Sequence, residues 1–277
     1  MAIKIITDST CDLPLTEQER LGIEILPLTL HFGETDYRDS YDITKKEFYN
    51  KLRAAKELPS TSQINPSAFL ECYEKLGADG SELLVITLAA NLSGTYQSAC
   101  IAAEQYGKPV RVVDSGTATT AESLLVQKAA ALRDAGASLD EIVDTLNALK
   151  SKLVIYACLN TLTYLQKGGR LSAASAVVGS LLNIKPVVKI QDGVVTVVHK
   201  ARGMKAAVDW MCSHAIEQGI DFTLPIGFVH SDNPDGAAEL KDYMAQHHPL
   251  GETLTLELGA VLGTHIGPGC TGLVVFH

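Results

Sequence analysis

Short apolar runs alternate with amphipathic segments along the first half of the chain. Four runs have the length and composition of buried strands: Ile3–Ile6, Ile23–Leu30, Leu83–Leu88 and Val110–Val113. Helices are predicted between them, at Lys45–Lys56, Pro66–Leu76, Ala118–Ala135 and from the loop Ala89–Ser93 to Tyr106. Thr44 and Glu47 match a capping box before the first of these helices. Strands that alternate with helices predict a parallel sheet covered on both faces.

The pattern changes after about residue 150. Two predicted strands, Val187–Ile190 and Val194–Val198, flank a tight turn at Asp192-Gly193. Further strands at Leu224–His230 and Thr253–Glu257 are accompanied by helices at Lys205–Gln218 and Asp235–His247. The sequence therefore predicts an α/β fold with two domains. Residues 1–150 form an N-terminal α/β domain with a parallel sheet, and residues 151–277 form a C-terminal α+β domain with a mixed or antiparallel sheet.

The composition indicates a folded globular protein, because 46% of the 277 residues are hydrophobic and 20% are charged. The net charge of −9 and the scattered Lys and Arg argue against nucleic acid and against an anionic membrane surface as partners. No apolar run approaches the ~18 residues of a membrane span. The N-terminus also lacks the charged and apolar regions of a signal peptide. We therefore expect a cytoplasmic protein without stable membrane insertion.

The six cysteines lie far apart, and none forms a C-x-x-C pair. Disulfide frameworks usually belong to short secreted chains, so free thiols in a reducing cytosol are expected. No spacing of Cys, His and acidic residues is typical of a metal site. We expect neither a metal nor a cofactor.

Three strands of the first half end in loops rich in Asp, Ser and Thr, which begin at Thr7, Ala89 and Asp114. In open α/β sheets, ligands bind outside the carboxyl ends of the strands. The same residues are also common in turns and helix caps, where their side chains bond to the local backbone. These loops are the first place to look for a ligand site, although the turn interpretation of Thr7–Pro14 stays equally open.

Two clusters of hydroxyl residues precede predicted helices. Ser60, Thr61 and Ser62 come before the helix at Pro66, and Ser93 and Thr95 flank Gly94. Such hydroxyls cap helices, and with free N–H groups they also form anion sites. Gly94 lets the backbone approach a ligand closely. From the residues alone, both interpretations stay open.

Two glycine-rich segments lie in the second half. Lys167–Ser172 lacks the spacing of a Walker phosphate loop, so an NTPase is not supported. In Gly263–Gly269, the glycines around His265 predict a stiff loop that approaches another segment closely. A lone histidine is more often a hydrogen-bonded structural residue than a ligand contact, and both interpretations stay open here.

Seven motifs, which occur in the order typical of the family, resemble those of the DegV family. They are TDSTCDLP at Thr7–Pro14, TSQ-x-x-PS at Thr61–Ser67, LSGTYQSA at Leu92–Ala99, DS at Asp114-Ser115, L-x-KGGR-x-S at Leu165–Ser172, KP at Lys185-Pro186 and GTH-x-GPG at Gly263–Gly269. The resemblance extends over residues 3–276. The second motif departs from TSQPSP-like versions of the family, but Thr61 is in place.

The resemblance implies an N-terminal and a C-terminal α/β domain that hold a long-chain fatty acid. It also implies a carrier that is not an enzyme itself. Such a carrier delivers the bound acid to a separate fatty acid kinase, which converts the carboxyl group to an acyl phosphate for phospholipid synthesis. Carried over to this sequence, Thr61, Ser93 and His265 hydrogen-bond the carboxylate. The residues implied near the head group or at the kinase interface are Ser62, Gly94, Thr95, Arg170, Arg202 and Thr264.

Two functions of other classes compete with the carrier. A hydrolase or transferase that acts on lipid esters or thioesters would use Ser93 as the nucleophile and His265 as its base. A purely structural or regulatory protein would leave the glycine-rich segment around His265 unexplained. The preferred chain length and saturation, the residues that line the tail pocket and the oligomeric state stay open.

Overall fold

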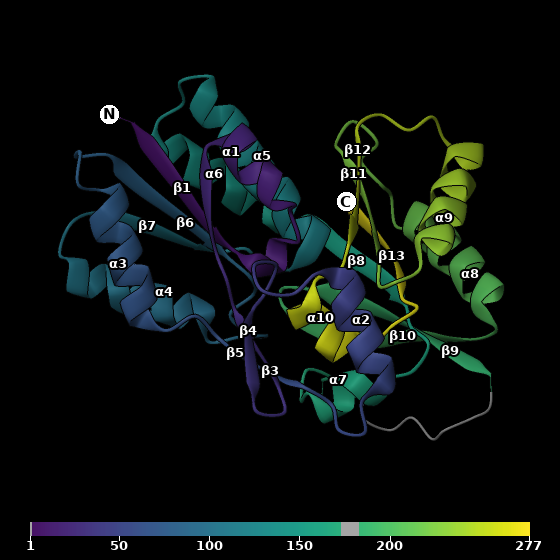
Figure 1. Cartoon of the computed structure of the whole chain (residues 1–277). Helices are drawn as coiled ribbons and strands as arrows, with labels where there is room; N and C mark the ends of the chain where they lie inside the picture. The colour runs from purple at the N-terminus through teal and green to yellow at the C-terminus, as the bar shows by residue number, and fades with distance from the viewer. Residues whose placement is uncertain (1, 173–182) are drawn as a thin grey trace.

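The computed structural model describes residues 2–172 and 183–277. This part of the chain forms two main sheets and one small sheet (Figure 1). The first sheet has the order β2-β1-β6-β7, with β1 at Ile3–Asp8, β2 at Ile23–Leu26, β6 at Glu82–Thr87 and β7 at Val110–Asp114. The second has the order β10-β9-β8-β13-β11-β12, with β8 at Leu153–Cys158, β9 at Ile184–Gln191, β10 at Val194–Arg202, β11 at Ile226–His230, β12 at Thr253–Glu257 and β13 at Thr271–Phe276. The small sheet, β4-β3-β5, contains β3 at Thr29–Phe32, β4 at Thr35–Arg38 and β5 at Ser60–Ser62.

Helices connect and cover these sheets. They are the short 3-10 helix η1 (Ser9–Cys11) and the α-helices α1 (Leu15–Leu21), α2 (Lys45–Ala54), α3 (Pro66–Leu76), α4 (Thr95–Tyr106), α5 (Thr119–Asp134), α6 (Leu139–Lys150), α7 (Thr163–Lys167), α8 (Met204–Glu217), α9 (Pro234–His247) and α10 (Ala260–Ile266). The predicted capping box at α2 is confirmed, because the backbone N–H of Glu47 donates to Thr44 Oγ1 and the Glu47 carboxylate accepts from the Thr44 backbone N–H.

Every strand pair in the first sheet is parallel, and Leu83 to Ile86 in its centre are fully buried. Helices α3 and α4 cover one face, and α5 and α6 cover the other (Figure 1). Apolar side chains must be buried on both sides of such a sheet, which explains the continuous apolar runs. The predicted parallel sheet covered on both faces is confirmed.

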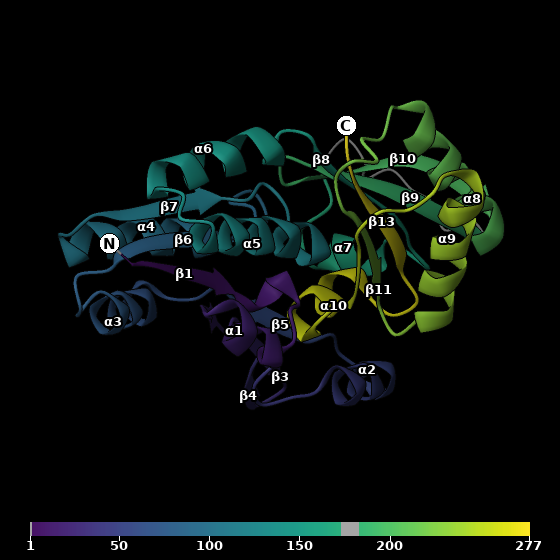
Figure 2. The same ribbon diagram turned by 90° about the horizontal axis from the view of Figure 1, so that it is seen from above.

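The second sheet is mixed. Its pairs are antiparallel except for β11 and β12, which run parallel. Helices α8 and α9 cover its outer face, and α5 of the first half packs against the other face (Figure 2). The predicted α/β fold with a separate mixed sheet is confirmed. One hydrophobic cluster, however, contains both Leu125 of α5 and Val274 of β13, so the core crosses residue 150. The domain boundary at that residue stays a prediction.

Helix α10 lies centrally between the two main sheets (Figures 1 and 2). It contacts α2, α7 and strands β3 and β5 of the small sheet. Residues 29–62, which form the small sheet and α2, belong to the first half of the sequence but pack around this helix from the second half. This packing positions the site described below.

The structure corrects two sequence expectations in detail, and it excludes one alternative that the sequence left open, the helix cap at Ser60–Ser62. The run Ile23–Leu30 is two strands in two sheets, because Pro27 has no N–H to donate and separates β2 from β3. Ser60–Ser62 is the strand β5 instead of a helix cap, and Asn65 caps α3 by accepting from the Ala68 N–H at 2.9 Å.

The second correction concerns Gly263–Gly269, which was expected to be a loop. Its first four residues complete α10, because the apolar residues Ala260–Leu262 start a helix in which the single Gly263 is tolerated. The helix ends at Gly267, whose φ of 76° is unfavourable for residues with a side chain. His265 therefore lies in the last turn of a helix.

Candidate functional site

An apolar cavity of about 320 Å³ is lined by both halves of the chain. The first half contributes apolar residues at the carboxyl end of its sheet and in the loops beyond it: Leu28, Leu88, Leu92 and Ala118. Strands of the second sheet contribute Ile155, Ala157, Ile190, Val195 and Val229, and the segments around α7 and α10 contribute Leu165, Leu258, Val261, Leu262, Ile266 and Cys270. The volume lies within the range of roughly 300–1,000 Å³ for small-molecule pockets. The cavity also lies where a parallel sheet is expected to bind a ligand.

A few polar residues interrupt this apolar lining: Thr61, Ser62, Gln63, Ser93, Gly94, Thr119, Arg170 and His265. The three residues predicted to hold a carboxylate, Thr61, Ser93 and His265, are thus brought to one cavity. Thr61 Oγ1 and His265 Nε2 are 2.9 Å apart and form a hydrogen bond. Thr61 lies in the middle of β5 and His265 near the end of α10, so the small sheet and the central helix meet at this bond.

On one side of this bond, Gly94 lies against Gln63. A methyl group on Gly94 would overlap the side-chain amide of Gln63. That amide donates from Nε2 to Ser98 Oγ at 2.9 Å, which fixes it against the start of α4. Gly94 is thus needed for close approach, as the sequence suggested, although its neighbour is a protein side chain.

On the other side, Arg170 links two segments of backbone. Its Nε donates to the carbonyl of Leu92 at 3.1 Å, and its Nη1 donates to the carbonyl of Gly168 at 2.6 Å. Gly168 in turn lies against His265, because a methyl group there would overlap the imidazole Nδ1. These contacts close a polar ring, which we define as Thr61, Gln63, Ser93, Gly94, Gly168, Arg170 and His265.

His265 is neutral at physiological pH. Burial, together with the nearby charge of Arg170, lowers the pKa of the imidazole to about 4. A neutral imidazole has one N–H donor and one acceptor nitrogen. Within the described residues Nδ1 has no hydrogen-bond partner. If Nε2 carries the proton, it donates to Thr61, and the hydroxyl of Thr61 then has its own proton to give to a carboxylate.

Ser93 precedes α4, where it supports the start of the helix and also lines the cavity. Its Oγ accepts from the Thr95 N–H at 3.3 Å and bonds to Thr95 Oγ1 at 3.0 Å, which supports the start of the helix. It also lines the cavity, whereas Thr95 is buried behind it and is not part of the lining. Ser93 is therefore part of the cavity wall, and the buried Thr95 bonds to it from behind.

The hydroxyl of Ser62 belongs to the opposite face of β5. Successive side chains of a strand alternate between faces, so Ser62 faces away from the neighbouring Thr61. Its Oγ is 2.6 Å from His31 Nε2, and His31 Nδ1 is 2.6 Å from Asp36 Oδ1. This order of groups matches an Asp-His-Ser triad, but the three side chains lie on the solvent side of the small sheet and connect its three strands. Ser62 is in the lining of the cavity, although its hydroxyl is turned to His31.

A second cavity of about 300 Å³ adjoins the first and shares Thr61, Arg170 and His265 with it. Its other lining residues are Leu58, Pro59, Ser60, Tyr164, Lys167, Gly168 and Thr264. The side chains of Ser60 and Lys167 are exposed, so this cavity connects the polar ring to the surface. Arg202 ends β10, is exposed and is in the lining of neither cavity.

The competing enzyme interpretation requires a bond between Ser93 and His265. Instead His265 Nε2 is bonded to Thr61, and Ser93 Oγ is bonded to Thr95. A nucleophile needs its base within hydrogen-bond reach, so this geometry does not favour the enzyme. Among residues 2–172 and 183–277, no group of His, Cys, Asp and Glu is arranged to hold a metal ion.

Four buried carboxyl groups near the cavity were not predicted as a group: Asp8, Asp12, Asp39 and Glu122. Burial raises the pKa of all four. Asp8 caps η1 by accepting from the Thr10 N–H at 3.0 Å, as the turn interpretation of Thr7–Pro14 expects. Neither Asp39 nor Glu122 belongs to any of the seven motifs.

The fold and the site together define a class of protein. It is a two-part α/β protein with an apolar cavity at the carboxyl end of a parallel sheet, and in the described part of the chain a small polar ring lines this cavity without a bond between Ser93 and His265. None of the helices in the described part of the chain is long and apolar enough to span a membrane.

Comparison with known proteins identifies the family. The DegV family model, described as an uncharacterised protein of the DegV family, matches residues 2–277, and the chain belongs to this family. A DegV domain-containing protein of Caldanaerobacter subterraneus subsp. tengcongensis is 35% identical over 273 residues, which are 98% of this chain and 97% of the relative. The motif resemblance is thereby confirmed.

Two solved structures are similar over nearly all of both chains. A DegV family protein from Thermus thermophilus, described by its fatty acid binding, has a TM-score of 0.90 and 34% identity and covers 100% of this chain and 99% of its own. The fatty acid kinase B3 protein from Streptococcus pneumoniae, described as loaded with linoleic acid, has a TM-score of 0.87 and 24% identity. It covers 100% of this chain and 99% of its own. The second likeness shows the fold alone.

Proposed function

We propose that this protein binds a long-chain fatty acid, with its tail in the apolar cavity and its carboxylate at the polar ring. The observation that carries this proposal is the bond between Thr61 and His265, which brings a hydroxyl and a neutral imidazole to the wall of an apolar cavity. Thr61 and Ser93 supply hydroxyl donors to the carboxylate, and His265 orients Thr61. A desolvated carboxylate requires such donors.

The tail supplies most of the affinity. About 14 buried methylenes at about 0.8 kcal/mol each give roughly 11 kcal/mol of gross transfer free energy. Association costs at least ~4 kcal/mol of this. The polar ring therefore has to orient the carboxylate more than attract it, and neutral donors suit a ligand that is later released.

We also propose that the protein is a carrier and that a separate kinase phosphorylates the bound acid. The second cavity supports this, because it joins the polar ring to exposed residues and contains the cations Lys167 and Arg170. The Streptococcus pneumoniae protein is described as part of a fatty acid kinase, but its likeness is one of fold. The kinase partner is therefore proposed from the family resemblance and from the open polar end of the cavity.

Mass spectrometry of freshly prepared, non-delipidated recombinant protein tests the binding. Gentle denaturation is expected to release one long-chain fatty acid per chain. Protein that releases none, and that does not take up added palmitic acid, contradicts the proposal. The kinase step is tested separately by adding a fatty acid kinase and ATP and measuring acyl phosphate formation on the bound acid.

A further inference from the structure

Helix α10 is central to the site but has little stability of its own. It is seven residues long, and isolated helices of fewer than ~12 residues are marginal in water. Its residues Val261, Leu262 and Ile266 line the apolar cavity, and His265 lies in the walls of both cavities. The position of His265 therefore depends on what holds this helix in place.

Two buried carboxyl groups hold its N-terminal end. The Gly259 N–H donates to Asp12 Oδ1 at 2.8 Å, and the Ala260 N–H donates to Asp39 Oδ1 at 3.1 Å. The first N–H groups of a helix have no partner within it, and acidic groups there also interact favourably with the helix dipole. Both acids are only 1% exposed and come from the other half of the chain, after η1 and after β4.

Gly259 allows both contacts at once. A methyl group at this position would lie 2.9 Å from Asp12 Oδ1 and 3.3 Å from Asp39 Oδ1. Both distances are shorter than a comfortable contact of carbon with oxygen, so a larger residue would push the helix away from the two acids.

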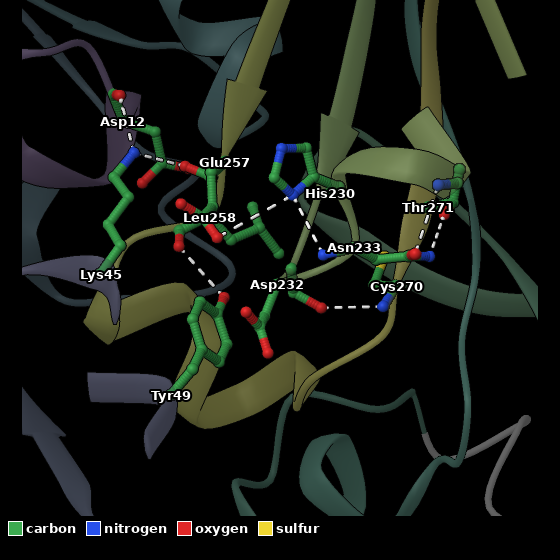
Figure 3. Close-up of polar contacts among 12 residues, drawn as sticks. Asp12, Lys45, Tyr49, His230, Asp232, Asn233, Glu257, Leu258, Cys270 and Thr271 are labelled. Atoms are coloured by element: carbon green, nitrogen blue, oxygen red, sulfur yellow. Dashed lines mark hydrogen bonds and ion pairs between the residues drawn. The ribbon is translucent and has the colours of Figure 1, made fainter. Parts of the chain in front are cut away.

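Asp12 also reaches the opposite wall of the cavity. Its Oδ2 accepts from Thr119 Oγ1 at 2.7 Å, and Thr119 lines the apolar cavity at the start of α5. One carboxyl group thus connects α5 with α10. Figure 3 shows Asp12 beside the segment that enters α10.

Helix α2 holds that entering segment from one side. Lys45 Nζ donates to the carbonyl of Glu257 at 2.5 Å and to the carbonyl of Asp12 at 3.3 Å, and Tyr49 Oη donates to the carbonyl of Leu258 at 3.0 Å (Figure 3). Lys45 and Tyr49 are four residues apart and share one face of α2. The backbone before α10 is therefore fixed on both sides.

We propose that Asp12 and Asp39 are positioning residues for the polar ring: by fixing the start of α10, they place His265 where it meets Thr61. Neither carboxyl group lines the cavity, so both act through the helix. The ligand measurements that test this role rest on the proposed fatty acid binding, whereas the measurement on His265 itself does not.

The first test compares palmitic acid with its methyl ester in the full-length protein. In Asp12→Ala and in Asp39→Ala, we expect the preference for the acid over the ester to fall about tenfold, because a misplaced His265 no longer supports the carboxylate. Asp8→Ala is the matched control: Asp8 is as deeply buried and accepts three hydrogen bonds, from Thr10 and Leu88, but none from α10. It is expected to keep the parent's preference.

The second test follows the imidazole of His265 by NMR in the ligand-free protein. Asp12→Ala and Gly259→Ala are expected to shift its signals, and Asp12→Asn, which retains an acceptor oxygen, is expected to restore the parent's position. If Asp12→Ala and Asp39→Ala do not fold, Gly259→Ala and Asp12→Asn still provide this comparison.

Unshifted His265 signals in Gly259→Ala, or an acid preference that falls equally in Asp8→Ala, would overturn the positioning role. A parent protein that binds neither palmitic acid nor its ester contradicts the proposed function instead. In that case the His265 signals alone decide whether Asp12 and Asp39 position the helix.

Discussion

The two ends of α10 hold polar groups in different ways. At the N-terminal end, the buried carboxyl groups of Asp12 and Asp39 accept backbone N–H groups and do not line the cavity themselves. At the C-terminal end, His265 is bonded to the hydroxyl of Thr61 and faces two cavities. The difference teaches how a short helix serves a ligand site: one end is anchored by acids, so the other can present a neutral group at a defined place.

The two ends of α10 are expected to differ most in how they make the free energy of unfolding depend on pH. Burial, together with the charge of Asp39, raises the pKa of Asp12 to about 7, although Lys45 opposes the shift. The folded protein therefore binds more protons at Asp12 than the unfolded chain between about pH 4 and 7, and this group makes the free energy of unfolding fall as pH rises. The pKa of His265 is lowered to about 4, so the unfolded chain binds more protons at this residue between about pH 4 and 6.5. His265 therefore makes the free energy of unfolding rise with pH over this range.

Urea unfolding at a series of pH values checks this contrast. In Asp12→Asn, the loss of unfolding free energy from pH 4.5 to 7 is expected to be smaller than in the parent, by on the order of 2 kcal/mol. In His265→Gln, the loss over the same range is expected to be larger than in the parent. Burial keeps the pKa of Asp8, of Asp39 and of Glu122 raised in both variants, so only the difference from the parent is diagnostic. Profiles that run parallel to the parent's in both variants contradict the assignment.

A smaller effect is expected from removing one hydroxyl at the ligand end. Ser93→Ala is expected to weaken fatty acid retention or transfer about tenfold while the fold stays intact, because a hydrogen bond to a charged group contributes roughly 1.5–3 kcal/mol. Ser67→Ala is a suitable control, since the Ser67 hydroxyl is exposed and bonds to Asn65. Fatty acid titration and circular dichroism measure the two effects. If Ser93→Ala binds the acid and supports phosphorylation like the parent, the carboxylate assignment is wrong.

The smallest effect is expected at Ser62, whose hydroxyl is bonded to His31 on the far face of β5, and at Arg202, which lines neither cavity. Ser62→Ala and Arg202→Ala are each expected to leave fatty acid affinity within about twofold of the parent, since substitutions away from packed features change stability by about 0.5 kcal/mol or less. Isothermal titration with palmitic acid measures this. A loss in Ser62→Ala as large as in Ser93→Ala would show that the hydroxyl behind β5 reaches the ligand. Arg202 keeps its proposed role at a kinase interface, which this titration does not address.

The sequence predicted the first sheet well because its strands are continuous apolar runs that alternate with amphipathic helices, which is typical of a parallel sheet buried on both faces. It did less well in the second half. Strands β8 and β13 lie in the centre of the mixed sheet, yet neither was predicted, because a short apolar run is equally typical of a buried helix. The break at Pro27 was visible in the sequence, but the apolar residues on both sides of it suggested a single strand.

For the site, motif order led to Thr61, Ser93 and His265, which the structure brings to one cavity. The contacts between them were beyond prediction, because Thr61 and His265 are 204 positions apart and no local pattern records such a pairing. Gln63 and Gly168 belong to recognised motifs, but their close approach to Gly94 and His265 depends on the packing of whole helices. Asp39 has no motif at all, and only the folded structure shows that it contacts α10.

The crossing of the two halves at α10 has a consequence for protein engineering. Cleavage of the backbone at residue 150 would leave Thr61 and Ser93 on one fragment and Arg170 and His265 on the other. Each fragment would lack half of the polar ring, and the apolar cluster that joins α5 to β13 would be exposed on both. If the proposed function holds, a fluorescent fatty acid is expected to bind only after the fragments reassociate, which would make the protein a route to a split reporter whose signal is the bound lipid.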